Sequence, residues 1–147
     1  MEISTKLRYG ARALTDLGLA YPDKIVPAGE LAKSQNLSVK YLEHILSAMK
    51  AAGIITSERG MGGGYRLARR PEEITLGCVF RALEGSPAPV RCVDSPEICD
   101  QSDICPTRPT WVELRDAVIE VLDSTTIADL SERARIATQS EKSAYQI

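Results

Sequence analysis

The sequence predicts a mainly α-helical fold that contains one small β-hairpin. Apolar residues recur at helical spacing through most of the chain, and most such segments follow a residue that caps helix N-termini. A single pair of β-prone segments, 54–58 and 65–69, flanks a glycine-rich turn at 60–64. With 147 residues and 44% hydrophobic content, the chain has room for one domain with a core and an extra element or two.

Three helices are expected before the hairpin. Ser4 can cap the first, which Tyr21-Pro22-Asp23 stops. Pro27 suits the start of a short second helix, and Ser38 can cap the third. The second and third helices are joined by a tight turn at Asn36-Leu37, so the pair is typical of a helix-turn-helix. The third helix has one apolar stripe: Val39, Leu42, Ile45, Leu46 and Met49.

The hairpin comes directly after this third helix, which is the position of a wing. Arg59 and Arg66 flank its tip. Gly62 and Gly63 would let the backbone pass close to a phosphate or into a minor groove, where side chains would collide. The first 85 residues are therefore predicted to form a winged helix-turn-helix domain.

The outward face of the third helix would contact DNA. Glu43 could accept a hydrogen bond from a cytosine amino group, and Lys40 and His44 could donate to guanine or phosphate. Ser38, beside the helix N-terminus, suits a phosphate. The full predicted DNA surface is Ser38, Lys40, Tyr41, Glu43, His44, Arg59, Gly62, Gly63 and Arg66. The alternatives are a solvated helix face and a winged helix that binds another protein.

Charge is divided unevenly along the chain. Residues 1–70 carry 11 Lys and Arg against 6 Asp and Glu, a net +5, whereas residues 71–147 carry 7 against 14, a net −7, and together these give the total of −2. A basic first half favours a polyanionic partner, and the acidic remainder favours a separate sensing or assembly role. This division argues for double-stranded DNA over a protein partner.

The second half continues with a short helix that Thr75 can cap and Gly85 ends. Residues 86–108 are expected to form a linker and a cysteine-rich loop, residues 109–137 a dimerisation helix and a terminal helix, and residues 138–147 a polar tail. A capping box at 126–129 starts the terminal helix. The long helix needs a surface to cover, and a second copy of the chain is the economical partner. Its predicted dimer contacts are Trp111, Leu114, Val118 and Leu122.

The segment CVDSPEICDQSDIC, residues 92–105, holds three of the four cysteines. Their spacing, C-x6-C-x5-C, lacks the paired C-x-x-C hooks of a zinc ribbon or knuckle. A disulfide framework also fits poorly, because residues 1–9 show no secretory signal and a reducing cytosol keeps thiols open. A metal or cluster site, a thiol switch and coincidence remain open from the residues alone. The acidic neighbours are expected to raise the pKa of the free thiols.

Cys78 stands apart from this group. It falls at the third position of its short helix, where an exposed thiol would have a lowered pKa, but a small, partly buried apolar role is the preferred interpretation. A cysteine-dependent enzyme is not expected, because the only histidine, His44, lies on the predicted DNA face. No run of the roughly 18 to 20 apolar residues that a membrane helix needs is present, so a cytoplasmic protein without a membrane partner is expected.

Several stretches together resemble the Rrf-type winged-helix transcriptional regulators. They are SVKYLEHIL, AAGIITSERGMGGGYRLARRPEEITL, the spaced cysteines with a Trp after them, and TTIADL, and they cover roughly residues 1–130. The resemblance implies a homodimer that binds an inverted repeat, with the long helix forming most of the dimer contact. It further implies that Cys92, Cys99 and Cys105 hold an iron-sulfur cluster, 2Fe-2S or 4Fe-4S, that senses iron-sulfur, redox or nitric oxide status. The alternative is a transcriptional repressor of the same fold that is controlled by a cluster-free thiol switch, or by a metabolite or partner.

The resemblance also suggests roles for two DNA-facing residues, and it has two departures. Arg59 would enter the minor groove, and Glu43 would help to discriminate between operator classes. The first departure is that six residues, Val93 to Ile98, separate the first two cysteines, where family members commonly have five. The second concerns the fourth ligand. The fourth cluster ligand is a histidine in one branch of the family and an aspartate in another, but the matching residues here are Arg108 and Arg8. A cluster on three thiolates with a weakly filled fourth position is expected to be labile, and aerobic preparations are expected to lack it.

Overall fold

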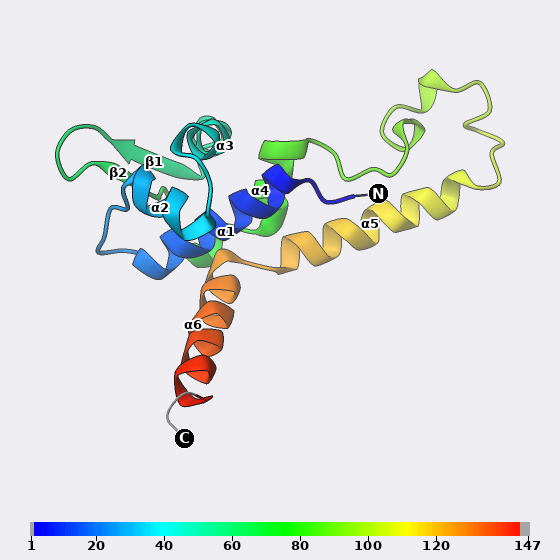
Figure 1. The fold of residues 1–147 in the computed structure, drawn as a ribbon. Coiled ribbons are helices and arrows are strands. Elements are labelled where there is room, and N and C mark those ends of the chain that lie inside the picture. The colour runs from blue at the N-terminus through cyan, green and yellow to red at the C-terminus, as the bar shows by residue number, and fades with distance from the viewer. Residues whose placement is uncertain (1, 145–147) are drawn as a thin grey trace.

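A computed structural model describes residues 2–144 as six α-helices and one two-stranded antiparallel sheet (Figure 1). This confirms the predicted fold class. Short 3-10 turns occur at Pro71–Glu73, Arg91–Val93 and Pro96–Ile98. The elements are α1 (Thr5–Ala20), α2 (Ala28–Gln35), α3 (Val39–Ala51), β1 (Ile55–Glu58), β2 (Gly64–Leu67), α4 (Leu76–Glu84), α5 (Arg108–Ser124) and α6 (Ile127–Ala144).

The helix starts follow from local capping. The Ser4 hydroxyl accepts a hydrogen bond from the Leu7 amide at 3.0 Å, and the Ser38 hydroxyl accepts one from the Tyr41 amide at 3.2 Å. Thr75 caps α4 in the same way, through the Cys78 amide at 3.2 Å. Each cap satisfies an amide that the helix itself leaves without a partner. All three caps were predicted from the sequence.

The core lies where α1, α3 and α4 meet, beneath α2 and the hairpin. Leu42, Ile45, Leu46 and Met49 of α3 are fully buried, as their spacing predicts. Burial of a side chain of this size contributes about 1.5–3 kcal/mol each. Val39, also assigned to this stripe, is 43% exposed. That assignment was wrong because Val39 begins the helix, where its side chain lies beyond the packed surface.

The wing is anchored to the rest of the domain by a short extra strand pairing. β1 and β2 pair in the register Ile55 with Leu67 through Glu58 with Gly64. On the other side of β2, Val26 and Tyr65 exchange backbone hydrogen bonds of 2.9 and 2.8 Å. Gly64 allows this approach, because a Cβ there would collide with the Val26 carbonyl oxygen. The hairpin is thus fixed to the connection between α1 and α2.

Backbone hydrogen bonds join the starts of α4 and α6 at the C-terminal end of α5, the foot of this helix. The Leu76 amide donates to the Thr125 carbonyl at 2.8 Å, and the Ile127 amide donates to the Ile74 carbonyl at 2.8 Å. Arg81 of α4 forms an ion pair with Asp123 of α5 at 2.7 Å. α6 then packs across α1. The helices after the wing are therefore connected directly to the core of the winged helix.

α5 extends away from the body of the molecule (Figure 1). None of its residues is buried within the described chain. α6 continues to Ala144 and so includes part of the expected polar tail, whose last residues, 145–147, lie outside the described residues, as does Met1. Between residues 2 and 144, no helix is long and apolar enough to cross a membrane.

Candidate DNA interface and cysteine loop

α3 presents a continuous polar face to solvent. Its predicted contact residues, Ser38, Lys40, Tyr41, Glu43 and His44, are all exposed. The residues on the opposite face of the same helix, Leu42, Ile45, Leu46 and Met49, are buried in the core. The helix therefore cannot rotate without exposing this apolar stripe. This face is therefore held rigidly, as a helix that enters the major groove requires.

The wing carries two arginines in different surroundings. Arg66 forms an ion pair with Glu58 across the hairpin, at 3.2 Å. Arg59 is exposed at the turn and has no ion-pair partner among residues 2–144. Gly62 has a φ of 75°, and a Cβ on Gly63 would collide with the Glu58 carbonyl oxygen. Glycine is thus required for the shape of the wing tip, in addition to any close approach to DNA.

A hollow of about 380 Å³ separates α3 from the wing. Glu43 and Lys50 lie on its α3 side, and Ser57, Arg59 and Tyr65 lie on its wing side. Residues that are far apart in the sequence therefore line one concave surface. Charged and hydrogen-bonding side chains face this hollow from both sides.

Tyr65 is a member of this surface that the sequence analysis missed. Its phenol is protonated at neutral pH and can donate a hydrogen bond; burial and, second, the nearby Glu43 carboxylate raise its pKa further. The signal that could have found it is cross-strand pairing, because Tyr65 lies directly opposite Ser57 on the hairpin. That signal became readable only once the register was known.

The cysteine loop lies at the N-terminal end of α5, far from the wing (Figure 1). Cys99 is exposed, and Cys92 and Cys105 are partly exposed. Two contacts hold the loop to α5: the Arg108 guanidinium donates to the Cys92 carbonyl at 3.1 Å, and Arg115 lies 3.7 Å from the Asp94 carboxylate.

Three thiols have the right donor chemistry for an iron-sulfur cluster. However, the part of the chain that the structure describes has no group of three or more His, Cys, Asp or Glu side chains placed to hold a metal ion. The convergence of Cys92, Cys99 and Cys105 on one site stays a prediction. The two 3-10 turns and the contacts with Arg108 and Arg115 give the loop a defined backbone path beside α5.

The thiols also differ from expectation in their chemistry. The hydrogen bond with the Thr107 hydroxyl, at 3.3 Å, and the amides of Thr107 and Arg108 lower the pKa of Cys105. The expectation that acidic neighbours would raise it was wrong for this residue, because hydrogen bonds at the start of α5 stabilise the thiolate. The Thr75 hydroxyl likewise lowers the pKa of Cys78, with help from Arg81 and Arg69.

The predicted dimer residues lie along α5. Leu114 is 38% exposed, and Trp111 and Val118 are partly exposed. Leu122, near the foot of the helix, packs in part against the core of its own chain. The N-terminal part of α5 therefore presents apolar side chains that the described chain covers only in part.

Comparison with known proteins identifies the family. The sequence profile of the Rrf2 family, described as iron-dependent transcriptional regulators, matches residues 3–133. Protein rrf2 of Nitratidesulfovibrio vulgaris is 38% identical over 136 residues, which are 92% of this chain and 91% of that protein. The transcriptional regulator CymR of Bacillus subtilis is 39% identical over 145 residues, 99% of this chain and 97% of that protein.

Solved structures agree with this result. The structure of CymR, described as the global cysteine regulator of B. subtilis, has a TM-score of 0.75 at 38% identity and covers 90% of this chain and 98% of its own. The structure of T. potens IscR has a TM-score of 0.77 at 34% identity, with coverage of 93% and 90%. The fold, the profile and these relatives together show that the chain belongs to the Rrf2 family of transcriptional regulators and is not an enzyme.

Proposed function

We propose that this transcriptional regulator is a homodimer that binds an inverted repeat in double-stranded DNA and senses iron-sulfur, redox or nitric oxide status through a labile cluster. The observation that carries the DNA part is the hollow between α3 and the wing, which Glu43 and Arg59 line from opposite sides. Since it would act on chromosomal DNA, we also propose that it works in the cytoplasm.

The DNA contacts follow from position and charge. Lys40, Glu43 and His44 would face base edges and phosphates from α3, with Ser38 and Tyr41 beside them. Arg59 would enter the minor groove, while Gly62 and Gly63 let the wing backbone approach. Arg66 would serve mainly to order the wing, because it is already paired with Glu58.

The dimer would place two copies of this surface on one duplex. We propose that Trp111, Leu114 and Val118 of α5 pack against the same residues of a second chain. Such a two-fold contact is self-complementary, and its symmetry would match that of an inverted repeat. Leu122 would join the interface only at its edge, because it also contacts the core of its own chain.

The sensor would use Cys92, Cys99 and Cys105 as thiolate ligands. Two observations support this assignment. Thiolates are the ligands that such clusters prefer, and three of them lie close together in sequence on a loop that contributes few side chains to the core. When bound, an iron-sulfur cluster would supply a group that oxygen, nitric oxide or iron shortage can alter or remove. Cys78 would stay outside the site, because Thr75, Arg81 and Arg69 engage it at the start of α4.

A physical connection leads from the loop to the DNA surface. The loop contacts α5 through Arg108 and Arg115, and the foot of α5 is joined to α4 by the Arg81–Asp123 pair. α4 packs against both α1 and α3. A change in the loop when a cluster binds would therefore be transmitted to α3, the helix that would face DNA.

A second candidate mechanism is a cluster-free thiol switch. The lowered pKa of Cys105 favours it, because a thiolate is the form that reacts with oxidants and disulfides. Both mechanisms use the same loop and the same connection to α5. They differ in whether iron is present.

Fluorescence anisotropy with labelled duplexes selected from a random pool tests the DNA part. We expect selected sequences to contain an inverted repeat and the affinity to fall steeply with salt concentration, as phosphate contacts require. Selection that yields no repeat, or an affinity that does not respond to salt, would contradict this part of the proposal.

Anaerobic reconstitution with iron and sulfide tests the sensor. We expect visible absorption that is lost in Cys92→Ala, Cys99→Ala and Cys105→Ala and kept in Cys78→Ala, the matched control. Protein that stays colourless and free of iron after reconstitution would exclude the cluster. In that case, loss of DNA binding on mild oxidation, prevented by Cys105→Ala, would support the thiol switch.

A further inference from the structure

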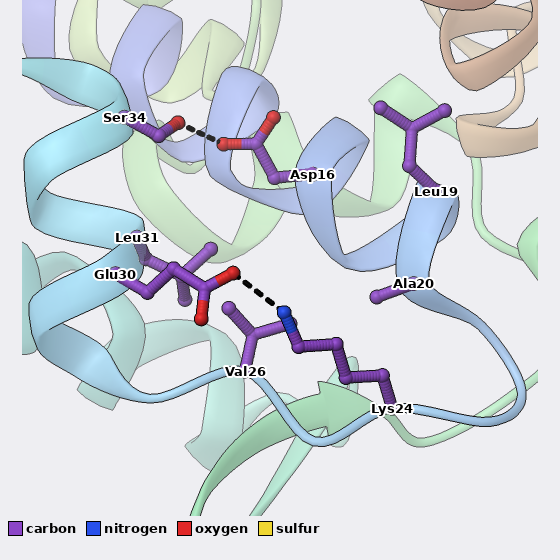
Figure 2. Close-up of a pocket in the computed structure, with 8 residues that line it drawn as sticks. All are labelled: Asp16, Leu19, Ala20, Lys24, Val26, Glu30, Leu31 and Ser34. Carbon is purple, nitrogen blue, oxygen red and sulfur yellow. Dashed lines mark hydrogen bonds and ion pairs between the residues drawn. The ribbon is translucent and has the colours of Figure 1, made fainter.

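A cavity on another side of the winged helix has no role in the proposed function. It has a volume of about 390 Å³ and lies between the C-terminal half of α1 and α2 (Figure 2). This volume is within the range of small-molecule sites. Leu19, Val26 and Leu31 provide apolar walls, and the polar groups come from Asp16, Lys24, Glu30 and Ser34.

The polar wall has more acceptors than donors. One oxygen of Asp16, Oδ2, accepts from the Ser34 hydroxyl and from the Gln35 amide nitrogen, the latter at 2.7 Å. One oxygen of Glu30, Oε1, accepts from the Lys24 ammonium at 2.7 Å. No hydrogen bond from residues 2–144 reaches the second oxygen of either carboxylate. Two carboxylates and one ammonium leave this wall with a net negative charge.

Gln35 adds a buried acceptor beside the same wall. Its side chain is 5% exposed, and its amide nitrogen donates to both Asp16 and Ser34. Its oxygen, Oε1, has no hydrogen-bond partner within the described chain. Rotation of the amide would not help, because it would turn this oxygen toward the Asp16 carboxylate. The cluster around Asp16 therefore has more hydrogen-bond acceptors than donors. The Ser34 hydroxyl and the Gln35 amide nitrogen already donate within it.

We propose that this cavity binds a small molecule that carries a protonated primary amine on a short apolar body. An ammonium offers three donors and a positive charge, which the free oxygens of Asp16 and Glu30 complement. The apolar body would lie mainly against Leu19, which is 40% exposed, with the buried Val26 and Leu31 at the floor of the cavity. Lys24 and Glu30 do not block entry, because their side chains are 56% and 52% exposed and such pairs exchange easily.

A ligand here would touch the elements that position the DNA surface. The cavity wall includes α1, α2 of the helix-turn-helix, and Val26, whose backbone pairs with Tyr65 of the wing. Occupancy would thus change the DNA affinity of the regulator. This consequence rests on the proposed function, whereas binding of the amine itself does not.

Titration of the DNA-free, isotope-labelled protein with n-butylammonium chloride, followed by amide NMR, tests the proposal. We expect saturable shifts at the amides of Leu19, Val26 and Leu31. n-Butanol lacks the charge and butyrate reverses it, so both are expected to bind about tenfold more weakly or worse. Leucine and leucinamide distinguish amino acids from simple amines: tighter binding of leucine that Lys24→Gln abolishes would show that Lys24 receives a ligand carboxylate.

Variants locate the site. Glu30→Gln is expected to weaken n-butylammonium about tenfold, because it removes one charged acceptor from an exposed pair without touching the core. Asp16→Asn should act in the same direction, although it also alters the contacts with Ser34 and Gln35. Asp23→Asn is the control, because it removes the same charge from the neighbouring connection outside the cavity.

Three results would overturn the proposal: no saturable shifts, equal binding of n-butanol and n-butylammonium, or equal weakening by Asp23→Asn and Glu30→Gln. Saturable binding in a protein that fails to bind any duplex would leave the cavity assignment intact and reject the DNA proposal instead. The two outcomes are therefore separable.

Discussion

Arg59 and Arg66 have the same charge on the same hairpin, but only Arg66 is engaged by a carboxylate, that of Glu58. An arginine without a partner is available to a narrow minor groove, where the negative potential is strongest. We expect Arg59→Ala to weaken DNA binding by about 1–3 kcal/mol, most strongly on A·T-rich flanks. Anisotropy titrations on duplexes that differ only in these flanks would measure it.

Arg66→Ala is the matched control for Arg59→Ala, because it removes the same charge from the same hairpin. It is expected to lower affinity less and with no preference for flank sequence. Equal losses in the two variants would show that the wing contributes general charge and that Arg59 makes no specific contact.

Arg108 stands where one branch of the family has a histidine ligand, and here its guanidinium holds the Cys92 carbonyl. The residue that departs from the family pattern thus fastens the loop to α5. Arg108→His would offer a fourth ligand nitrogen, so we expect the reconstituted cluster to survive exposure to air several-fold longer. Decay of the visible absorption measures this lifetime. Arg108→Gln, which frees the loop but offers no such ligand, should not prolong it.

At the scale of elements, the start of α6 has a reciprocal cap. Asp129 accepts from the Thr126 amide and hydroxyl, both at 2.8 Å, and its own amide donates to Thr126 at 3.1 Å. The amide of Thr126, first, and its hydroxyl lower the pKa of Asp129. Thr126→Ala is expected to cost about 1 kcal/mol of unfolding free energy, as loss of an N-cap typically does.

The lowered pKa also sets a pH dependence. Because the carboxylate is favoured in the folded state, its contribution is complete above the ordinary pKa of 3.8 and is lost as pH falls through the lower, folded-state value. Urea unfolding of the wild type and of Asp129→Asn should therefore differ at neutral pH, and the difference should begin to shrink below about pH 4 and vanish only in stronger acid. A difference that persists unchanged in acid would show that the charge of Asp129 is not responsible.

Elements set by local signals were predictable from the sequence. Ser4, Ser38 and Thr75 mark the helix starts, and the glycine-rich turn marks the hairpin, because each signal acts within a few residues. The pairing of Val26 with Tyr65 was not predictable, since it joins segments far apart in the sequence. The length of α6 also escaped prediction, because a polar sequence without Pro or Gly can continue a helix begun elsewhere.

The residues of the candidate site likewise divide into those that local sequence predicted and those that depend on long-range contacts. The outward face of α3 follows from subtracting its buried stripe, so its exposed residues could be named in advance. Tyr65 could not, because its place in the hollow depends on the hairpin register and on the approach of α3. The thiol chemistry of Cys105 depended on where α5 begins, and a shift of that start by one turn would have changed its neighbours.

At the scale of the whole molecule, the wing and the cysteine loop lie at opposite ends, and α5 spans the distance between the loop and the core (Figure 1). The foot of α5 is secured by the Arg81–Asp123 pair and by backbone bonds of Leu76 and Ile127. Its upper part has no buried residue within the described chain. An amphipathic helix with an uncovered apolar face is not stable in isolation, which favours a partner.

The last prediction concerns that partner. Leu114→Lys and Val118→Lys would place a charge at the centre of a two-fold contact, where it would meet its own copy and lack a compensating carboxylate. We expect monomers by sedimentation at micromolar concentration and a loss of affinity for an inverted repeat. Affinity for a single half-site should stay close to that of the wild type, because each winged helix is intact.

Glu120→Gln is the control for these substitutions, because it changes the net charge by the same amount on the opposite face of α5. It should stay dimeric and bind the inverted repeat normally. A wild-type protein that sediments as a monomer, or a Leu114→Lys variant that remains dimeric, would reject α5 as the interface. Loss of binding to the half-site as well as the repeat would show instead that the substitution damages the winged helix through the foot of α5.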